Sequence, residues 1–390
     1  MTAEAAAPGP LAGIRVVDLS RALSGPYASL MLADAGADVI KVERPGAGDD
    51  TRGWGPPFVG GEHDGAQAES AYFLSVNRSK RSVVLDLKDA DDLAALRRLL
   101  ADADVLIENF RPGVMDRLGL GPAALEELNE RLVVLSITGF GEGGPDGHRS
   151  GFDQIIQGEA GLMGVTGPVG GPPTKVGVPI TDILSGMFGA HGVVAALYER
   201  ERSGKGQRVT TSLLAAAVAV HTFQGTRWTL AGEVPEPGGN RHPTIQPYGA
   251  YACADGHVNV AVGSEGLWRR FAPTVGLDVD DPRFATNRDR VANVDVLQAE
   301  IDARLAGDTV ETWMTRFDEA GVPAGRIRTM DQVYAWEQLA HLGLVDHVSH
   351  PTVGEMDLPG APLRWSRSGR RPADPPPTLG QHSGEILGPE

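Results

Sequence analysis

The chain has 390 residues, of which 41% are apolar and 22% charged, a composition typical of globular proteins. Because this length exceeds what one hydrophobic core usually organises, two domains are expected. Fifty-one acidic against 35 basic residues give a net charge of −16, which argues against nucleic acid or an anionic membrane as partner. An anionic ligand must therefore be bound by a local group of basic side chains.

The first strand is expected at residues 14–19, followed by a helix at 24–37 and a strand at 38–43. The same alternation continues with a strand at 81–87, a helix at 89–103, a strand at 105–110, a helix at 122–131 and a strand at 132–138. This order predicts right-handed βαβ crossovers and a Rossmann-like parallel sheet, the α/β fold class. In such a sheet a ligand binds beyond the carboxyl ends of the strands.

The character of the sequence changes after a long helical pattern at 181–206, which ends at the turn SGKG. We expect a flexible tail at 1–10, a large domain at 11–224 and a smaller α+β domain at 225–330. The last segment, 331–390, is rich in proline and is expected to be largely extended and to return to the large domain.

Cofactor motifs are missing from the sequence. The turn after the first strand, LSRALSGPYAS, contains only Gly25, so NAD or FAD binding through G-x-G-x-x-G is not expected. There is no P-loop, G-x-S-x-G or H-E-x-x-H motif. Cys253 is the only cysteine and the ten histidines do not cluster, so no metal site is expected. With neither a signal peptide nor a membrane span evident, a cytoplasmic location is expected.

Several motifs, in one order, resemble those of family III CoA-transferases (CaiB/BaiF type), a group that also contains α-methylacyl-CoA racemases. They are VERPGAGDDTRGWGPP, NRSKRSVVLDLK, ENFRPGVMDRLG, SGFDQIIQGEAGLMGVTG, GNRHPTIQPYGAY and LGQH, and they cover nearly the whole chain after Leu11. Within the family, VERPGAGDDTRGWGPPFVG and HPTVGEMDLPGAPLR are most similar to the succinyl-CoA:glutarate CoA-transferase branch. The resemblance implies an interlocked homodimer, with the C-terminal segment crossing to the partner.

The resemblance also implies that the loop after residue 43 borders a CoA site. Positions that match the family's CoA contacts are Leu23, Ser24, Arg44, Leu85, Lys88, Asn109, Phe110, Arg111 and Arg117. Arginine suits the phosphates of CoA because its donors are planar and permanently charged. Judged without the family, an arginine after a strand is more often solvated or ion-paired, and Leu85 and Phe110 also fit a core.

Asp182 matches the family's catalytic aspartate. Without the family, an aspartate before an apolar run is most often a helix N-cap. We expect the positive end of the helix to keep this carboxylate ionised, so that it attacks an acyl-CoA thioester and becomes an aspartyl-CoA thioester. Gly238 and Gly239 are candidate oxyanion donors, with a surface turn as the alternative. Arg241 and His242 beside them are candidates for binding a carboxylate, with a surface role as the alternative.

Two positions bear on the reaction and its substrate. Trp54 matches a family tryptophan beside the reaction centre, with a packing role equally open. Phe152 stands where the racemases carry a histidine, and it cannot exchange a proton. We therefore predict an acyl-CoA:carboxylate CoA-transferase that acts on dicarboxylic acids such as succinate or glutarate. An acyl-CoA racemase or isomerase and a non-catalytic acyl-CoA-binding protein remain as alternatives.

Overall fold

The computed structural model describes residues 8–61 and 68–388, so most of the predicted tail at 1–10 lies outside the described residues. The described chain forms two compact units. The larger contains the residues up to Leu162, Lys175–Gly232 and the residues from Glu337 onward. The smaller contains Met163–Thr174 and Glu233–Trp336.

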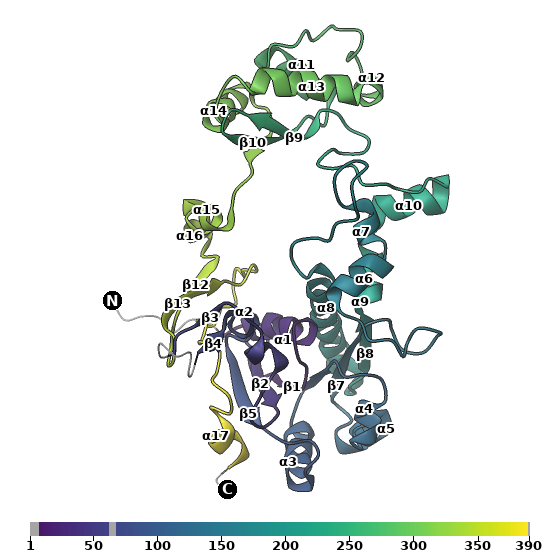
Figure 1. Cartoon of the computed structure of the whole chain (residues 1–390). Helices are drawn as coiled ribbons and strands as arrows, with labels where there is room; N and C mark the ends of the chain where they lie inside the picture. Colours follow the sequence, from purple (N-terminus) through teal and green to yellow (C-terminus); the bar gives the residue numbers. More distant parts are fainter. Residues whose placement is uncertain (1–7, 62–67, 389–390) are drawn as a thin grey trace. The chain divides into compact units, whose positions relative to one another are not determined.

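A parallel sheet of six strands, in the order β5-β2-β1-β6-β7-β8, forms the centre of the larger unit (Figure 1). Its strands are β1 (Arg15–Asp18), β2 (Asp38–Glu43), β5 (Lys80–Val84), β6 (Val105–Glu108), β7 (Val133–Thr138) and β8 (Arg208–Ser212). This confirms the predicted parallel sheet, although β8 was not among the predicted strands. Because the chain moves outward in opposite directions from β1 and β6, the topological switch point lies between these two strands.

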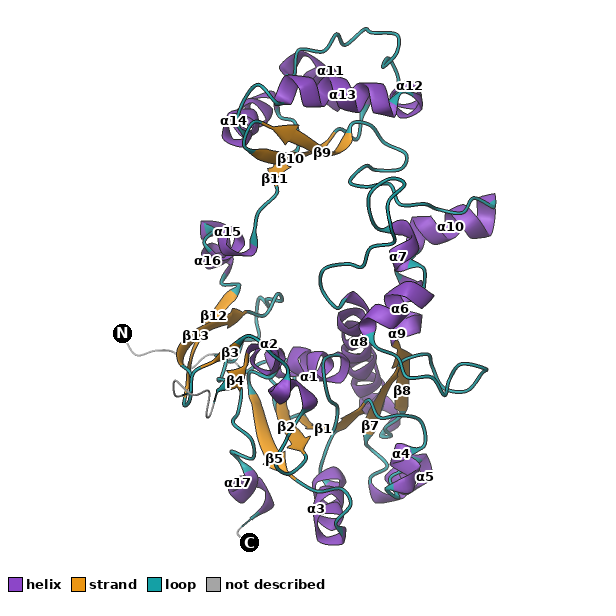
Figure 2. Ribbon diagram, viewed as in Figure 1, coloured by secondary structure: helices purple, strands orange, loops and turns teal. Residues whose placement is uncertain are grey.

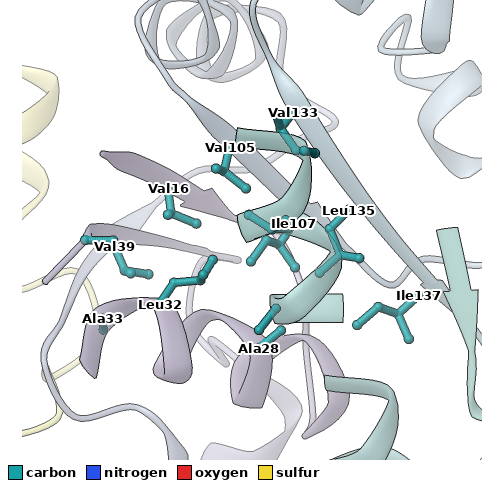
Figure 3. Packing of buried hydrophobic residues seen from close by; sticks show 14 of the residues in the cluster. Val16, Ala28, Leu32, Ala33, Val39, Val105, Ile107, Val133, Leu135 and Ile137 are labelled. Atoms are coloured by element: carbon teal, nitrogen blue, oxygen red, sulfur yellow. The ribbon is translucent and has the colours of Figure 1, made fainter. Parts of the chain in front are cut away.

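Alternate residues of the central strands enter two separate cores. On one face, residues such as Val16, Ile107 and Leu135 pack against α1 (Ser24–Asp34) and α8 (Ile180–Ser203) (Figure 3). On the other face, residues such as Val17 and Leu106 pack against α3 (Ala90–Ala101) and α5 (Pro122–Leu128). A strand buried on both faces explains the continuous apolar runs in the sequence.

Helix α8 is long and apolar enough to cross a membrane by length and composition. In this fold it packs against α1, β7, β8 and α9 (Leu213–Ala219), as a core helix does. Gly189 permits this packing, because a Cβ there would lie 2.9 Å from a methyl group of Leu135 on β7. The helix ends at Gly204, whose φ of 76° closes it in the left-handed conformation.

Short elements complete the larger unit (Figure 2). Two antiparallel pairs join β3 (Phe58–Val59) to β4 (Glu69–Ser70) and β12 (Val345–His350) to β13 (Gly354–Pro359). The helices are η1 (Asp50–Gly53), α2 (Ala71–Val76), α4 (Val114–Arg117), α6 (Asp153–Glu159), α10 (Thr222–Ala231), α16 (Glu337–Leu342) and α17 (Ser383–Leu387). The C-terminal segment reaches the main sheet, where His382 N–H donates to Ser82 O of β5 at 2.9 Å.

The smaller unit combines one antiparallel sheet with helices. Its strands run in the order β11 (Ala324–Arg326), β10 (Gly256–Ala261) and β9 (Tyr248–Cys253). Its helices are α7 (Leu162–Val165), which starts at the unit boundary, α11 (Glu265–Thr274), α12 (Asn287–Ala292), α13 (Val294–Leu305), α14 (Val310–Ala320) and α15 (Met330–Tyr334). Aromatic side chains including Trp268, Phe271 and Phe317 fill its core.

Candidate active site

The loop after β2 is fastened from its inner side. Arg52 donates two hydrogen bonds of 2.7 Å to the carboxylate of Glu43 and lies 3.6 Å above the ring of Phe73. Asp49 and Thr51 of the same loop are buried. Arg44 and Trp54, near the two ends of the loop, remain partly exposed. The segment KVERPGAGDDTRGWGPP therefore has an inner face that anchors it and an outer face that a ligand can reach.

A cavity of about 370 Å³ lies beyond the carboxyl ends of four strands, at the switch point between β1 and β6. Four predicted CoA residues line it, namely Arg44, Leu85, Lys88 and Phe110. The structure adds Leu19 and Arg21, which follow β1 and which the sequence did not single out. The predicted residues that follow β2, β5 and β6 are thus brought to one place by the order of the strands.

The cavity wall carries a local excess of available positive charge. Three basic residues, Arg21, Arg44 and Lys88, line it against two acidic ones, Glu43 and Asp86. Glu43 is already paired with Arg52. Arg44 forms an ion pair with Asp50, yet its Nε is a buried donor that has no acceptor among the described residues. A buried donor without a partner is costly, so this N–H leaves the Arg44 guanidinium only partly satisfied by its described partners.

Other predicted CoA residues have structural roles nearby. The side chain of Asn109 accepts from Arg21 N–H at 2.9 Å and donates to Arg21 O at 2.8 Å, so it fixes the loop after β1. The same side chain lies 3.3 Å from Ser24 Oγ. Leu23 is buried in a small apolar cluster with Ile183 of α8. Within the described residues, the lining of this cavity includes none of Leu23, Ser24 and Asn109.

Arg111 and Arg117 do not line this cavity either. Arg111 lines a second cavity, of about 440 Å³, which extends along β6, β7 and β8. Arg117 is exposed at the end of α4. Neither arginine lines the cavity that contains Arg44 and Lys88, and the predicted contact of both with CoA stays a prediction.

Asp182 is the third residue of α8, and the alternative that it is an N-cap is wrong because Pro179 holds that position. The carboxylate that serves the start of the helix belongs to Asp153 of α6. Its Oδ1 accepts hydrogen bonds from the N–H and the hydroxyl of Thr181, both at 2.9 Å. Gln157 donates to its other oxygen at 2.7 Å. Among the described residues, none donates a hydrogen bond to the Asp182 carboxylate.

Burial, together with the negative charge of Asp153, raises the pKa of Asp182 to about 7. Burial therefore opposes the effect expected of the helix end, which favours the ionised carboxylate. Desolvation disfavours the charged form, and Thr181 directs its donors to Asp153 instead. A pKa of about 7 means that Asp182 is partly protonated and partly ionised near neutral pH.

Tyr72 of α2 contacts Trp54 of the loop after β2 and shares an apolar cluster with Ile183, the residue after Asp182. Burial, followed by the charges of Asp182, Asp153 and Asp49, raises the pKa of Tyr72 to about 12. Its ring packs in the apolar cluster that contains Ile183, and the indole of Trp54 meets it edge-on at 5.1 Å between ring centroids. The indole is 39% exposed. No motif in the sequence had marked Tyr72.

Helices α1 and α8 meet at a glycine one turn after Asp182. A Cβ on Gly186 would lie 2.6 Å from Ser24 O, so only glycine lets the first turn of α1 approach α8 this closely. The start of α1, which follows the cavity wall, and the start of α8, which carries Asp182, are therefore held together in one unit.

A family model describes almost the whole chain: residues 11–383 match CoA-transferase family III. The chain belongs to this family. It is 39% identical over 380 residues to the succinyl-CoA:glutarate CoA-transferase of Mus musculus, covering 97% of this chain and 86% of that protein. It is 41% identical over 387 residues to the succinate–glutarate CoA-transferase of Agrobacterium fabrum, covering 97% and 95%.

A solved structure has the same fold. A CaiB/BaiF family protein from Brucella suis superposes with a TM-score of 0.88 at 37% identity, over 97% of this chain and 98% of that one. The predicted family is thereby confirmed. Within the described residues of this family III chain, no group of three or more histidine, cysteine or acidic side chains is arranged to hold a metal ion.

The remaining predicted residues of the family III site divide between the two units. Phe152 precedes Asp153 in the larger unit and is 60% exposed. Gly239 has a φ of 61°, and its N–H donates to Gly167 O at 2.9 Å within the smaller unit. That N–H is therefore already used in this structure. Arg241 forms an ion pair of 2.6 Å with Asp295, and the His242 ring stacks on Tyr248.

Proposed function

We propose that this protein transfers CoA from succinyl-CoA to a second dicarboxylic acid, with Asp182 as the group that carries CoA between them. Membership of the family and the names of two relatives, a succinyl-CoA:glutarate and a succinate–glutarate CoA-transferase, support the substrate class. The observation that carries the proposal is the place of Asp182, a partly buried carboxylate that receives no hydrogen bond from the described residues and stands at the start of α8 beside α1.

The reaction begins when a carboxylate oxygen of ionised Asp182 attacks the thioester carbonyl of succinyl-CoA. The C–S bond breaks, the CoA thiolate leaves, and a mixed anhydride of Asp182 and succinate remains. The thiolate then attacks the aspartyl carbonyl, which releases succinate and leaves an aspartyl-CoA thioester. The acceptor carboxylate repeats both steps in reverse order, so that acyl-CoA leaves and Asp182 is regenerated without a net change of protons or electrons.

The environment of Asp182 suits a nucleophile. An oxygen that receives no hydrogen bond keeps its electron pairs available, and burial raises the basicity of the carboxylate above that of a solvated aspartate. Its pKa of about 7 also leaves a substantial ionised fraction at neutral pH. In this proposal the same burial excludes water, which would otherwise hydrolyse the anhydride and the thioester.

The proposed CoA site is the cavity at the switch point of the sheet. Arg21, Arg44 and Lys88 supply positive charge for the phosphates, and Phe110 and Leu19 supply apolar surface for the adenine ring. From there the pantetheine arm would follow the start of α1 towards α8. Along or beside this route we place Leu23 and Ser24 as CoA contacts and Trp54 beside the reaction centre.

We also propose that the protein is an interlocked homodimer that works in the cytoplasm. One side of α8 exposes Met187, Phe188 and Tyr198, and α10 exposes Trp228 and Leu230. Large apolar side chains exposed on helix surfaces are typical of a subunit interface. Light scattering after size-exclusion chromatography should give twice the chain mass of 41.1 kDa, and a monomer at micromolar concentration would contradict the dimer.

Incubation with succinyl-CoA and glutarate tests the reaction. Transfer predicts glutaryl-CoA formed in equal amount to succinate, together with a covalent CoA adduct on the protein that is absent from Asp182→Asn. A racemase would instead incorporate deuterium at the α-carbon of a 2-methylacyl-CoA without exchanging acids. Binding of CoA with neither outcome would support the non-catalytic binding protein.

A further inference from the structure

The loop after β1 contains a backbone conformation that an L-residue rarely adopts. Ala22 has a φ of 64°, in the left-handed region that favours glycine. For a residue with a Cβ this conformation costs free energy, and it persists only where the surrounding structure imposes it. The turn lies between Arg21, which lines the proposed CoA cavity, and Leu23, which precedes α1.

A carboxylate from the loop after β2 imposes this turn. Oδ1 of Asp49 accepts the N–H of Ala22 at 3.2 Å, and it also accepts the N–H and the hydroxyl of Thr51, at 2.9 and 2.8 Å. The loop after β1 and the loop after β2, which both contribute to the cavity wall, are therefore joined at one oxygen atom.

Lys41 of β2 completes the arrangement. Its Nζ lies 2.8 Å from Oδ2 of Asp49 and donates to Ser20 O at 2.9 Å. The pair thus contacts the residues before and after Arg21, whose own backbone is held by Asn109. These contacts hold the backbone on both sides of Arg21.

Both charges are withdrawn from water. The side chain of Lys41 is 1% exposed and that of Asp49 is inaccessible. Burial alone would raise the pKa of Asp49, but the charge of Lys41 and hydrogen bonds from Lys41 and Thr51 outweigh it and lower the pKa to about 2. The pair therefore stays charged over the whole range in which the enzyme would work.

We infer that Lys41 and Asp49 are positioning residues of the CoA site. The pair holds Ala22 in the left-handed turn, which sets Arg21 in the cavity wall and starts α1 at the place where it meets α8. Neither side chain lines the cavity. The inference rests on the proposed function only in naming CoA as the ligand.

Asp49→Asn and the double variant Asp49→Asn/Ala22→Gly test this role. Titration calorimetry would give the Kd of CoA, and initial rates would give KM for succinyl-CoA and kcat. Asparagine keeps the acceptor but loses the charge that binds Lys41. We expect the Kd of CoA and the KM of succinyl-CoA to rise about tenfold, while kcat changes less. A tenfold change corresponds to the free-energy cost of holding an L-residue in the left-handed conformation. Glycine at position 22 should recover most of the loss, because it adopts this turn without a Cβ.

Arg200→Met is the matched control. The buried Arg200 forms an ion pair of 2.8 Å with the partly exposed Asp104, which precedes β6 at the opposite end of the sheet. This variant should lower Tm without changing the Kd of CoA. Ala22→Val, which leaves Asp49 intact, provides a second test, because a β-branched residue is still less suited to the turn and should weaken CoA binding.

Three results would overturn the inference: unchanged CoA affinity in Asp49→Asn or in Ala22→Val, no recovery in the double variant, or an equal loss of affinity in Arg200→Met. If Asp49→Asn does not fold, Ala22→Val decides. Failure of the wild-type protein to bind CoA would overturn the proposed function itself, and the two failures are therefore distinguishable.

Discussion

The carboxylate of Asp153 accepts both the N–H and the hydroxyl of Thr181, each at 2.9 Å, and thereby fixes the residue that precedes Asp182. Asp153 thus anchors the start of α8, and its negative charge also helps to raise the pKa of Asp182. The same carboxylate therefore positions the start of α8 and affects the ionisation of Asp182. The predictions on pH below depend on this double role.

The first prediction concerns the nucleophile. Asp182→Asn should reduce transfer of CoA from succinyl-CoA by roughly a thousandfold or more, because the amide cannot form the anhydride. Affinity for CoA should change little. A coupled assay for glutaryl-CoA and intact-protein mass spectrometry measure the two effects. Asp318→Asn, which alters an exposed carboxylate of the smaller unit, is the control. Normal transfer by Asp182→Asn would refute the mechanism.

The second prediction concerns pH. Since the ionised form of Asp182 attacks and its pKa is about 7, kcat/KM for succinyl-CoA should rise between pH 6 and 8 and then level off. Asp153→Asn removes the neighbouring negative charge, so the rise should move to lower pH. A pH–rate profile that is flat from 5.5 to 8 would show that Asp182 is ionised throughout.

The third prediction follows from the same pKa. A carboxyl group whose pKa is raised on folding binds its proton more tightly in the native state, so it lowers stability as pH rises from about 4 to about 7. Asp182→Asn should therefore be more stable than the wild type at pH 8 and differ less at pH 5. Urea unfolding at both pH values measures this difference, and a less stable variant at pH 8 would contradict it.

The fourth prediction concerns the contact between α1 and α8. Gly186→Ala places a Cβ 2.6 Å from Ser24 O, a backbone atom that cannot move freely, and should lower the free energy of unfolding by about 1–3 kcal/mol. Transfer should fall as well, because the start of α1 is displaced from Asp182. Gly266→Ala in α11 is the control, since its nearest neighbour is 3.9 Å away. Equal stability of the two variants would argue against close packing at Gly186.

The fifth prediction concerns the phosphates of CoA. Arg44→Met and Lys88→Met should each raise the Kd of CoA about tenfold at low salt, and less at high salt, because the lost contact is charged. The KM of the acceptor acid should stay unchanged. Arg131→Met, which alters an exposed arginine before β7, provides the comparison. Loss of CoA affinity in all three variants alike would indicate a general charge effect instead of a site.

The sequence by itself determined the first five strands of the parallel sheet, the long helix that carries Asp182, and the family. Short β-branched runs and glycine-ended helical patterns are local signals, and the family's motifs are read directly along the chain. The edge strand β8 was not predicted because its sequence, RVTTS, is short and only its last residue is buried. The junction of Met163–Thr174 with the smaller unit was likewise not evident from the sequence.

Only the tertiary structure determined which side chains contact one another around these elements and how the pKa of Asp182 is shifted. Asp153 and Thr181 are 28 residues apart, and Ala22 and Asp49 are 27 apart, so no local pattern reveals either contact. The raised pKa of Asp182 likewise depends on which groups surround it, not on its place at the start of a helix. Burial and charge act through space, and the folded arrangement of the loops determines which residues are near enough to matter.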